Sequence, residues 1–122
     1  MVRSKDAGPE LLVRQLLRGI GYPGYRVHRK ELPGHPDISF MGRKKALFVH
    51  GCFWHGHACR HGSNRPKSNQ FYWHAKIERN MARDKANEVK LSQLGWSVLT
   101  VWECELRFRE EASKKLAAFM AD

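Results

Sequence analysis

The 122-residue sequence lacks long apolar runs and is poor in acidic residues. No stretch approaches the roughly 18 consecutive apolar residues of a membrane-spanning helix, and no signal peptide is visible, so we expect a cytosolic protein. Asp and Glu number 12 against 22 Lys and Arg, which gives a net charge of +10 with His neutral. This excess predicts a polyanionic partner, with a merely solvated basic surface as the alternative.

Cysteine is also scarce, and its three copies cannot all pair within the chain. In a reducing compartment, clustered cysteines indicate a metal site or catalysis more often than disulfides. The length suits one compact core, and no internal repeat or low-complexity tract is present. We therefore expect a single domain over residues 1–122, with residues 1–8 as a short N-terminal arm.

The spacing of apolar residues predicts a mixed α/β chain. Helices are expected over residues 9–20, from Ser68 or Asn69 to residue 94, and over 105–120. Strands are expected at 25–28, 38–40, 46–49 and 96–102. The second and third strands are joined by a tight link and should form a hairpin, and the last, which is apolar and β-branched, is expected to be central in the sheet.

Residues 45–59 begin as a buried strand and end in a dense set of metal-binding side chains, among them His50 and His55. Cys52-x4-His57-x-Cys59, with Cys104 far downstream, supplies three thiolates and one imidazole. Structural zinc favours such a closed tetrahedral set, so this Zn²⁺ would not be catalytic. His55 and His61 are substitute ligands, and three buried free cysteines are the alternative.

A second group of side chains suits phosphodiester cleavage. The predicted hairpin brings Asp37 and His50 together, and Glu10 and His55 could surround the same phosphate. Such cleavage needs a divalent cation; carboxylates suit Mg²⁺, and a histidine can serve as general base or acid. The alternatives are a turn or capping role for Asp37 and a helix-dipole role for Glu10.

Aromatic side chains lie among these polar groups. Phe53 and Trp54 occupy a glycine-bounded loop, where we expect them to wedge between bases rather than pack in a core. Phe71 and Tyr72 are expected to be core, just before Trp73 at a helix start. One face of that helix carries a polar stripe, which contacts either DNA phosphates or only solvent. The stripe consists of Lys76, Asn80 and Arg83.

Together these motifs resemble the very short patch repair (Vsr) family of DNA mismatch endonucleases. The resemblance rests on the Leu-Pro-Gly-His-Pro-Asp run ending at Asp37, on residues 48–59, on residues 76–84 and on residues 95–104. It covers most of the chain, from about Pro9 to the C-terminal helix. It implies a restriction-endonuclease-like (PD-(D/E)XK-type) fold, in which α-helices flank a central mixed β-sheet.

The resemblance also implies an activity and partners. The activity is a Mg²⁺-dependent nick in double-stranded DNA, 5′ to the T of a T:G mismatch left by deamination of 5-methylcytosine, which starts short-patch repair. A monomeric bacterial cytoplasmic protein is expected, acting at the nucleoid, with mismatch-repair proteins as candidate partners. A nickase of altered specificity, for example defence-linked, and a zinc-stabilised DNA-binding module without catalysis are the competing hypotheses.

Carried over by motif, the resemblance implies a role for each matching residue. Asp37 would bind Mg²⁺ with the backbone carbonyl of Val49, where the family usually has Thr. His50, His55 and Glu10 would complete the catalytic group. The structural zinc ligands would be Cys52, His57, Cys59 and Cys104, and the intercalating aromatics Phe53, Trp54 and Trp73. The family also carries a longer N-terminal arm than residues 1–8.

Overall fold

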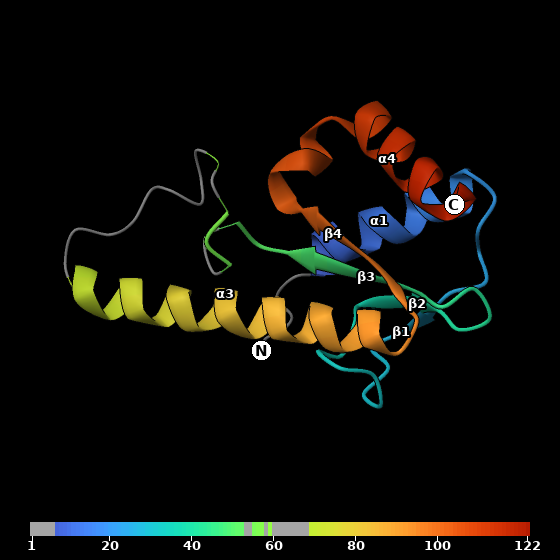
Figure 1. Ribbon diagram of the computed structural model, residues 1–122. Helices are drawn as coiled ribbons and strands as arrows, with labels where there is room; N and C mark the ends of the chain where they lie inside the picture. Colours follow the sequence, from blue (N-terminus) through green and yellow to red (C-terminus); the bar gives the residue numbers. More distant parts are fainter. Residues whose placement is uncertain (1–6, 53–54, 58, 60–68) are drawn as a thin grey trace.

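The computed structural model describes residues 7–52, 55–57, 59 and 69–122 (Figure 1). In chain order the elements are α1 (Ala7–Gly19), β1 (Arg26–Val27), β2 (Ile38–Phe40), β3 (Lys45–His50), α3 (Gln70–Gln93), β4 (Ser97–Trp102), the 3-10 helix η1 (Glu103–Arg107) and α4 (Arg109–Ala121). The sheet lies between α3 on one side and α1 with α4 on the other (Figure 1). The expected mixed α/β architecture with flanking helices is therefore confirmed. No helix among the described residues is both long and apolar enough to cross a membrane.

The four strands form one mixed sheet in the order β1-β2-β3-β4. β2 and β3 pair antiparallel with Ile38 opposite Leu47, as the predicted hairpin requires. β3 and β4 pair parallel, with His50 opposite Trp102. The expectation that this last strand is central was wrong, because within the described residues β4 lies at an edge of the sheet.

Burial on both faces explains why an edge strand has the sequence of a central one. One apolar cluster, which includes Leu47, Val49 and Val101, joins the sheet to α1 and α4. A second cluster joins Phe48 to Leu91 of α3, with Val98 packed against it. Apolar side chains on both faces of β4 are therefore covered by helices, and a strand needs such residues whether or not it has two neighbours.

The C-terminal segment departs from the single helix expected over 105–120. Residues Glu103–Arg107 form η1, and α4 begins only at Arg109. Phe108 separates the two, with a non-helical backbone at φ −115° and ψ 83°. The Trp102 backbone N–H donates to the Glu105 carboxylate at 2.8 Å. This bond closes a tight turn directly after β4, so the chain changes direction before α4 starts.

The helix α3 is longer than the sheet that it covers. Its 24 residues span about 36 Å, whereas the six residues of β3 span about 20 Å. Its N-terminal half projects past the sheet (Figure 1). Phe71 and Tyr72 lie on that half and are 88% and 52% exposed. The expectation that they are core residues was wrong, because the sheet does not extend beneath them.

Candidate functional site

Asp37 stands at the start of β2, where the hairpin brings it against the end of β3. Its Oδ2 accepts a hydrogen bond of 2.7 Å from the backbone N–H of Val49. This bond fixes the carboxylate to the strand that ends in His50. The hairpin therefore does what the sequence predicted, since Asp37, Val49 and His50 all line one cleft.

The rings of His50 and His55 stack on each other, with centroids 3.7 Å apart and an interplanar angle of 4°. His50 ends β3, and His55 lies in the turn that follows. The backbone N–H of His55 donates to the Gly51 carbonyl at 3.3 Å. Five residues of separation thus become a face-to-face contact. The two imidazoles present one surface to the cleft beside Asp37.

Asp84 of α3 completes this group. Its Oδ2 lies 2.5 Å from Nδ1 of His55 and 3.9 Å from Nδ1 of His50. A carboxylate on one ring nitrogen orients the imidazole and leaves the other nitrogen for proton transfer. Ligand atoms of His50, His55 and Asp84 also lie within 4.8 Å of one another, close enough to share a cation.

His50 is the most strongly perturbed imidazole of the group. Its side chain is 10% exposed, and its Nδ1 is buried without a hydrogen-bond partner. Burial lowers the pKa of His50 from 6.5 to about 4, with a further lowering by His55 that Asp84 partly opposes. The ring is therefore neutral at neutral pH, with a lone pair available for a proton or a metal ion.

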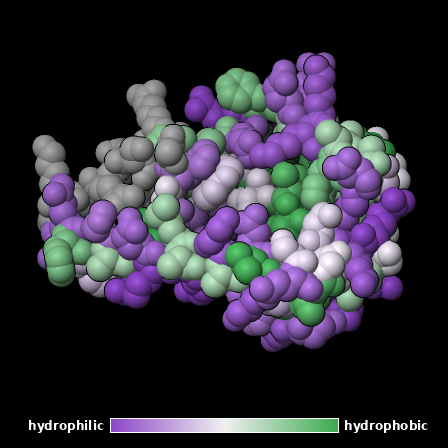
Figure 2. Space-filling view, viewed as in Figure 1, coloured by the Kyte–Doolittle hydropathy of each residue, from purple (hydrophilic) through white to green (hydrophobic). Residues whose placement is uncertain are grey.

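The cleft has a volume of about 560 Å³ and lies between α3 and the sheet. Asp37, His50 and His55 line it together, as expected. Arg83 and Lys85 of α3 line it as well and bring positive charge to the cleft. On the face shown in Figure 2, hydrophilic and apolar residues alternate along α3.

Glu10 lies near Asp37, as the sequence suggested, but in a group with His28 and not with His50 and His55. Among the described residues it is not part of the cleft lining. Its side chain is buried, forms an ion pair with Arg14, and lies 2.9 Å from Nε2 of His28. Ligand atoms of Glu10, His28 and Asp37 fall within 4.8 Å of one another. Asp37 therefore links two clusters.

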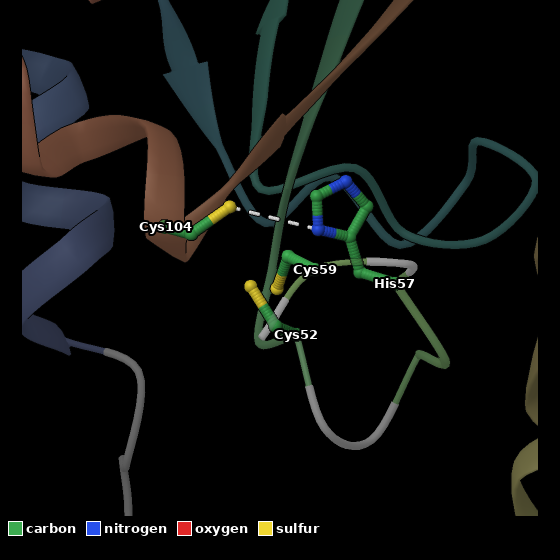
Figure 3. A group of neighbouring side chains, drawn as sticks. All are labelled: Cys52, His57, Cys59 and Cys104. Atoms are coloured by element: carbon green, nitrogen blue, oxygen red, sulfur yellow. Dashed lines mark hydrogen bonds between the residues drawn. The ribbon is translucent and has the colours of Figure 1, made fainter. Parts of the chain in front are cut away.

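The four predicted zinc ligands converge (Figure 3). Ligand atoms of Cys52, His57, Cys59 and Cys104 all lie within 4.8 Å of one another, and the cysteines form no disulfide. Cys104 comes from η1, the other three from the loop after β3. Sγ of Cys104 is 3.6 Å from Nδ1 of His57. Tetrahedral zinc with ordinary bond lengths separates such atoms by about 3.6 Å, so the donor set and this one distance fit the ion.

Burial raises the pKa of the Cys52 thiol to about 12 and raises that of Cys104. Without a metal these sulfurs are therefore protonated, and zinc binding must release their protons. His55 faces Asp84, whereas His57 completes the thiol cluster. His61, the other substitute ligand, lies outside the described residues.

Trp102, at the end of β4, joins the two clusters. Its ring stacks on His57, with centroids 4.1 Å apart, and meets the edge of His50 at 5.3 Å. Because one rigid ring contacts both imidazoles, the position of the thiol cluster helps to set the position of the stacked histidines. Nothing in the sequence pattern predicts this role of Trp102.

The described residues that were expected to contact DNA lie on α3. Trp73 is half-buried and packs edge-on against Tyr72, with centroids 5.1 Å apart. Arg83 donates to the side-chain oxygen of Asn80 at 3.0 Å, so two members of the polar stripe are in contact, one turn from Lys76. Phe53 and Trp54, the expected wedge, lie outside the described residues.

Besides Trp102, the places of Asp84 and His28 in the site were not predicted from the sequence. Asp84 follows Arg83 within one of the motifs quoted for the resemblance, and its place beside the polar stripe was the available signal. His28 ends the expected strand over 25–28, and no spacing rule connects it with Glu10 or Asp37. Only the pairing of β1 with β2 brings it there.

Comparison with known proteins gives consistent matches. A sequence model of the family described as "DNA mismatch endonuclease Vsr" matches residues 1–61. The chain is 58% identical over 105 residues to the type II nicking enzyme V.XorIIP of Xanthomonas oryzae pv. oryzae, covering 86% of this chain and 76% of that protein. It is 43% identical to the type II nicking enzyme V.NmeAIP of Neisseria meningitidis, over 94% of this chain and 81% of that one. It is 39% identical to the DNA mismatch endonuclease Vsr of Escherichia coli K12, over 90% and 69%.

Proposed function

The chain belongs to the Vsr family of DNA mismatch endonucleases, and from this premise we propose that it nicks one strand of duplex DNA at a mismatch. The observation that carries the proposal is the shared cleft of Asp37, His50 and His55, with Asp84 held against His55. A carboxylate and oriented imidazoles beside basic side chains suit hydrolysis of a phosphodiester.

In this reaction His55 is the general base. Asp84 holds its Nδ1, which leaves Nε2 to take a proton from the attacking water. His50, neutral because its pKa is about 4, stacks on His55 and keeps its plane fixed. A neutral neighbour also avoids placing a second positive charge beside the imidazolium that forms on His55.

We assign the catalytic cation, Mg²⁺, to Asp37 and the backbone carbonyl of Val49, since this ion favours oxygen ligands. When bound, Mg²⁺ supplies charge neutralisation on the phosphate and activation of water. Val49, where the family usually has Thr, can still supply this carbonyl because a backbone carbonyl does not depend on the side chain, whereas any role of the Thr hydroxyl is lost. Its N–H meanwhile holds the Asp37 carboxylate in place.

The thiol cluster is proposed as a closed structural zinc site. Its support is the convergence of three thiols and one imidazole from two distant segments. Zinc there would tie the loop after β3 to η1. Phe53, Trp54 and Trp73 are proposed to insert into the duplex beside the mismatch. Lys76, Asn80 and Arg83 would contact the DNA backbone.

We propose T:G as the preferred mismatch, cut 5′ to the thymine. The test is a nicking assay on labelled duplexes that carry T:G, T:C or a fully paired site, with and without Mg²⁺. The expected result is Mg²⁺-dependent nicking of the T:G duplex alone. In Asp37→Asn, which keeps the shape of the side chain but loses its charge, the rate should fall at least about 100-fold. Wild-type nicking without any divalent cation, or a fully active Asp37→Asn variant, would refute the proposal.

A nickase of different specificity is the second candidate. It is favoured by the names of two relatives, which are called type II nicking enzymes rather than mismatch endonucleases. The same panel of duplexes separates the two functions, since this candidate would nick the T:C or paired site as fast as T:G. A DNA-binding module without catalysis would bind all three duplexes and nick none.

A further inference from the structure

The end of β1, the start of β2 and the end of β3 lie side by side at one end of the sheet. This arrangement sets the order of the side chains around Asp37. His28 directly follows β1, Asp37 directly precedes β2, and His50 ends β3. Because the strands lie side by side in the order β1-β2-β3, Asp37 falls between His28 and His50. The backbone N–H of His28 donates to the Asp37 carbonyl at 3.2 Å, which fixes this neighbour relation.

His28 forms a pair with a carboxylate that matches the pair on the other flank. Its Nε2 lies 2.9 Å from Oε1 of Glu10, as Nδ1 of His55 lies 2.5 Å from Asp84. The side chain of Glu10 is 8% exposed, whereas that of His28 is 57% exposed. One ring nitrogen is thus held by a buried carboxylate, and the imidazole as a whole remains accessible to a substrate.

The backbone of His28 has a φ of +51°, in the left-handed region, where histidine occurs more often than most residues with a side chain. Among the described residues His35, Lys44 and Asn69 share such a φ, so this conformation supports a role for His28 only together with its contacts. Here the hydrogen bonds to Asp37 and Glu10 hold both the backbone and the ring of His28.

We propose that His28 is the general acid of the nicking reaction and donates a proton to the leaving oxygen, with Glu10 as its positioning residue. The inference rests on the proposed function. Water attacks phosphorus and gives its proton to His55; the bond from phosphorus to O3′ breaks; His28 gives a proton to O3′. The products are a 5′-phosphate and a 3′-hydroxyl, and exchange with solvent restores both imidazoles.

The spacing of the sheet suits this assignment. Adjacent strands lie about 4.8 Å apart, so groups on β1 and β3 are about 10 Å apart. In the reaction, a base and an acid each form a hydrogen bond of about 2.8 Å to one of two oxygens that lie about 4 Å apart across phosphorus. The distance from the base to the acid is then also about 10 Å. A base on the β3 side and an acid on the β1 side therefore flank a phosphate bound at Asp37 from opposite ends.

The decisive experiment compares two substrates with the same scissile site. One is the ordinary T:G duplex, and the other carries sulfur in place of the scissile O3′, a leaving group that departs as a thiolate without needing a proton. In single turnover with saturating Mg²⁺, His28→Gln should nick the ordinary duplex about 100-fold more slowly than wild type. On the sulfur substrate the variant and wild type should agree within about twofold.

Glu10→Gln is a second, independent test. It should slow nicking of the ordinary duplex, by less than His28→Gln does, and leave the rate on the sulfur substrate close to that of wild type. His74→Gln is the matched control, because His74 is also an exposed histidine paired with a glutamate on its own helix, Glu78, and should leave both rates unchanged. Affinity for uncut T:G duplex and the thermal unfolding midpoint should be equal in wild type and His28→Gln, since neither depends on the proton donor.

Equal slowing of both substrates by His28→Gln, or no slowing of either, would overturn the role of His28. Equal slowing together with a higher Mg²⁺ requirement would identify His28 as a metal ligand instead and overturn the proposal in the same way. These results leave the proposed function standing. A wild-type protein that nicks neither duplex would overturn the proposed function, and the inference with it.

Discussion

Nδ1 of His55 lies 2.5 Å from Oδ2 of Asp84, although the two residues are 29 positions apart in the chain. One belongs to the turn that follows β3, and the other to the middle of α3. The contact joins α3 to the turn that carries His55, and it leaves Nε2 as the ring nitrogen that the proposed reaction uses. Any shift of α3 relative to the sheet therefore moves His55, the proposed general base.

Asp84→Asn should reduce nicking of the T:G duplex by about 100-fold or more, because an amide cannot stabilise the imidazolium that forms on His55. Binding of the uncut duplex should change little. The measurement is a single-turnover rate alongside an affinity for uncut DNA. Glu88→Gln is the control, since Glu88 also lines the cleft from α3 but lies one turn further along the helix. Equal rates in wild type and Asp84→Asn would remove Asp84 from the mechanism.

Purified protein should contain about one equivalent of zinc. A strong chelator should lower the thermal unfolding midpoint of wild type by 10 °C or more, on the order expected when several kcal/mol of metal-linked folding energy is lost. Cys104→Ser should start from the lower midpoint and not respond to the chelator. A zinc content well below one equivalent, or a chelator response equal in both proteins, would contradict the closed site.

Acidification should destabilise the fold through His50. Its pKa is about 4 when folded and about 6.5 when unfolded, so below pH 6.5 the unfolded chain binds a proton that the folded chain does not. The stabilisation is present above pH 6.5 and is lost as the pH falls toward 4. Between pH 7 and pH 5 the loss is about 2 kcal/mol.

Denaturant unfolding at the two pH values measures this loss. His50→Asn removes the titrating group, so its free energy of unfolding should fall about 2 kcal/mol less than that of wild type over the same interval. Groups that do not interact with His50, including the thiols, are common to both proteins and cancel in the comparison. Identical pH dependence in the two proteins would mean that His50 is not held neutral by burial.

Gly56→Ala should displace the loop that carries His55. Gly56 has φ +66°, and a Cβ there would lie 2.5 Å from Sδ of Met81 and 2.8 Å from Cγ2 of the fully buried Ile77. Gly21→Ala is the matched control, with φ +95° but no atom within 4 Å of its Cβ. Both variants carry the cost of the left-handed backbone, about 1 kcal/mol. Only Gly56→Ala should also slow nicking, and equal nicking rates in the two would refute the packing argument.

The sequence alone was sufficient for features that depend on local pattern or ligand chemistry. The hairpin of β2 and β3 follows from two apolar runs joined by a four-residue link, and it placed Asp37 beside His50 in advance. The set of Cys52, His57, Cys59 and Cys104 was recognisable because few side chains other than Cys and His suit a closed zinc site. The alternation of side chains along a strand and the residue types that bind a metal can both be recognised directly in the sequence.

Only the tertiary structure decided which residues from distant segments contact these side chains. Asp84 reaches His55 only because α3 packs on the sheet through Leu91 and Phe48, and the sequence of a helix does not state its neighbour. His28 reaches Glu10 and Asp37 only because β1 pairs with β2. β1 has two residues, too few for an alternation of apolar and polar side chains to be recognised in the sequence. The edge position of β4 was hidden for the same reason: burial by helices and burial by strands select the same apolar residues.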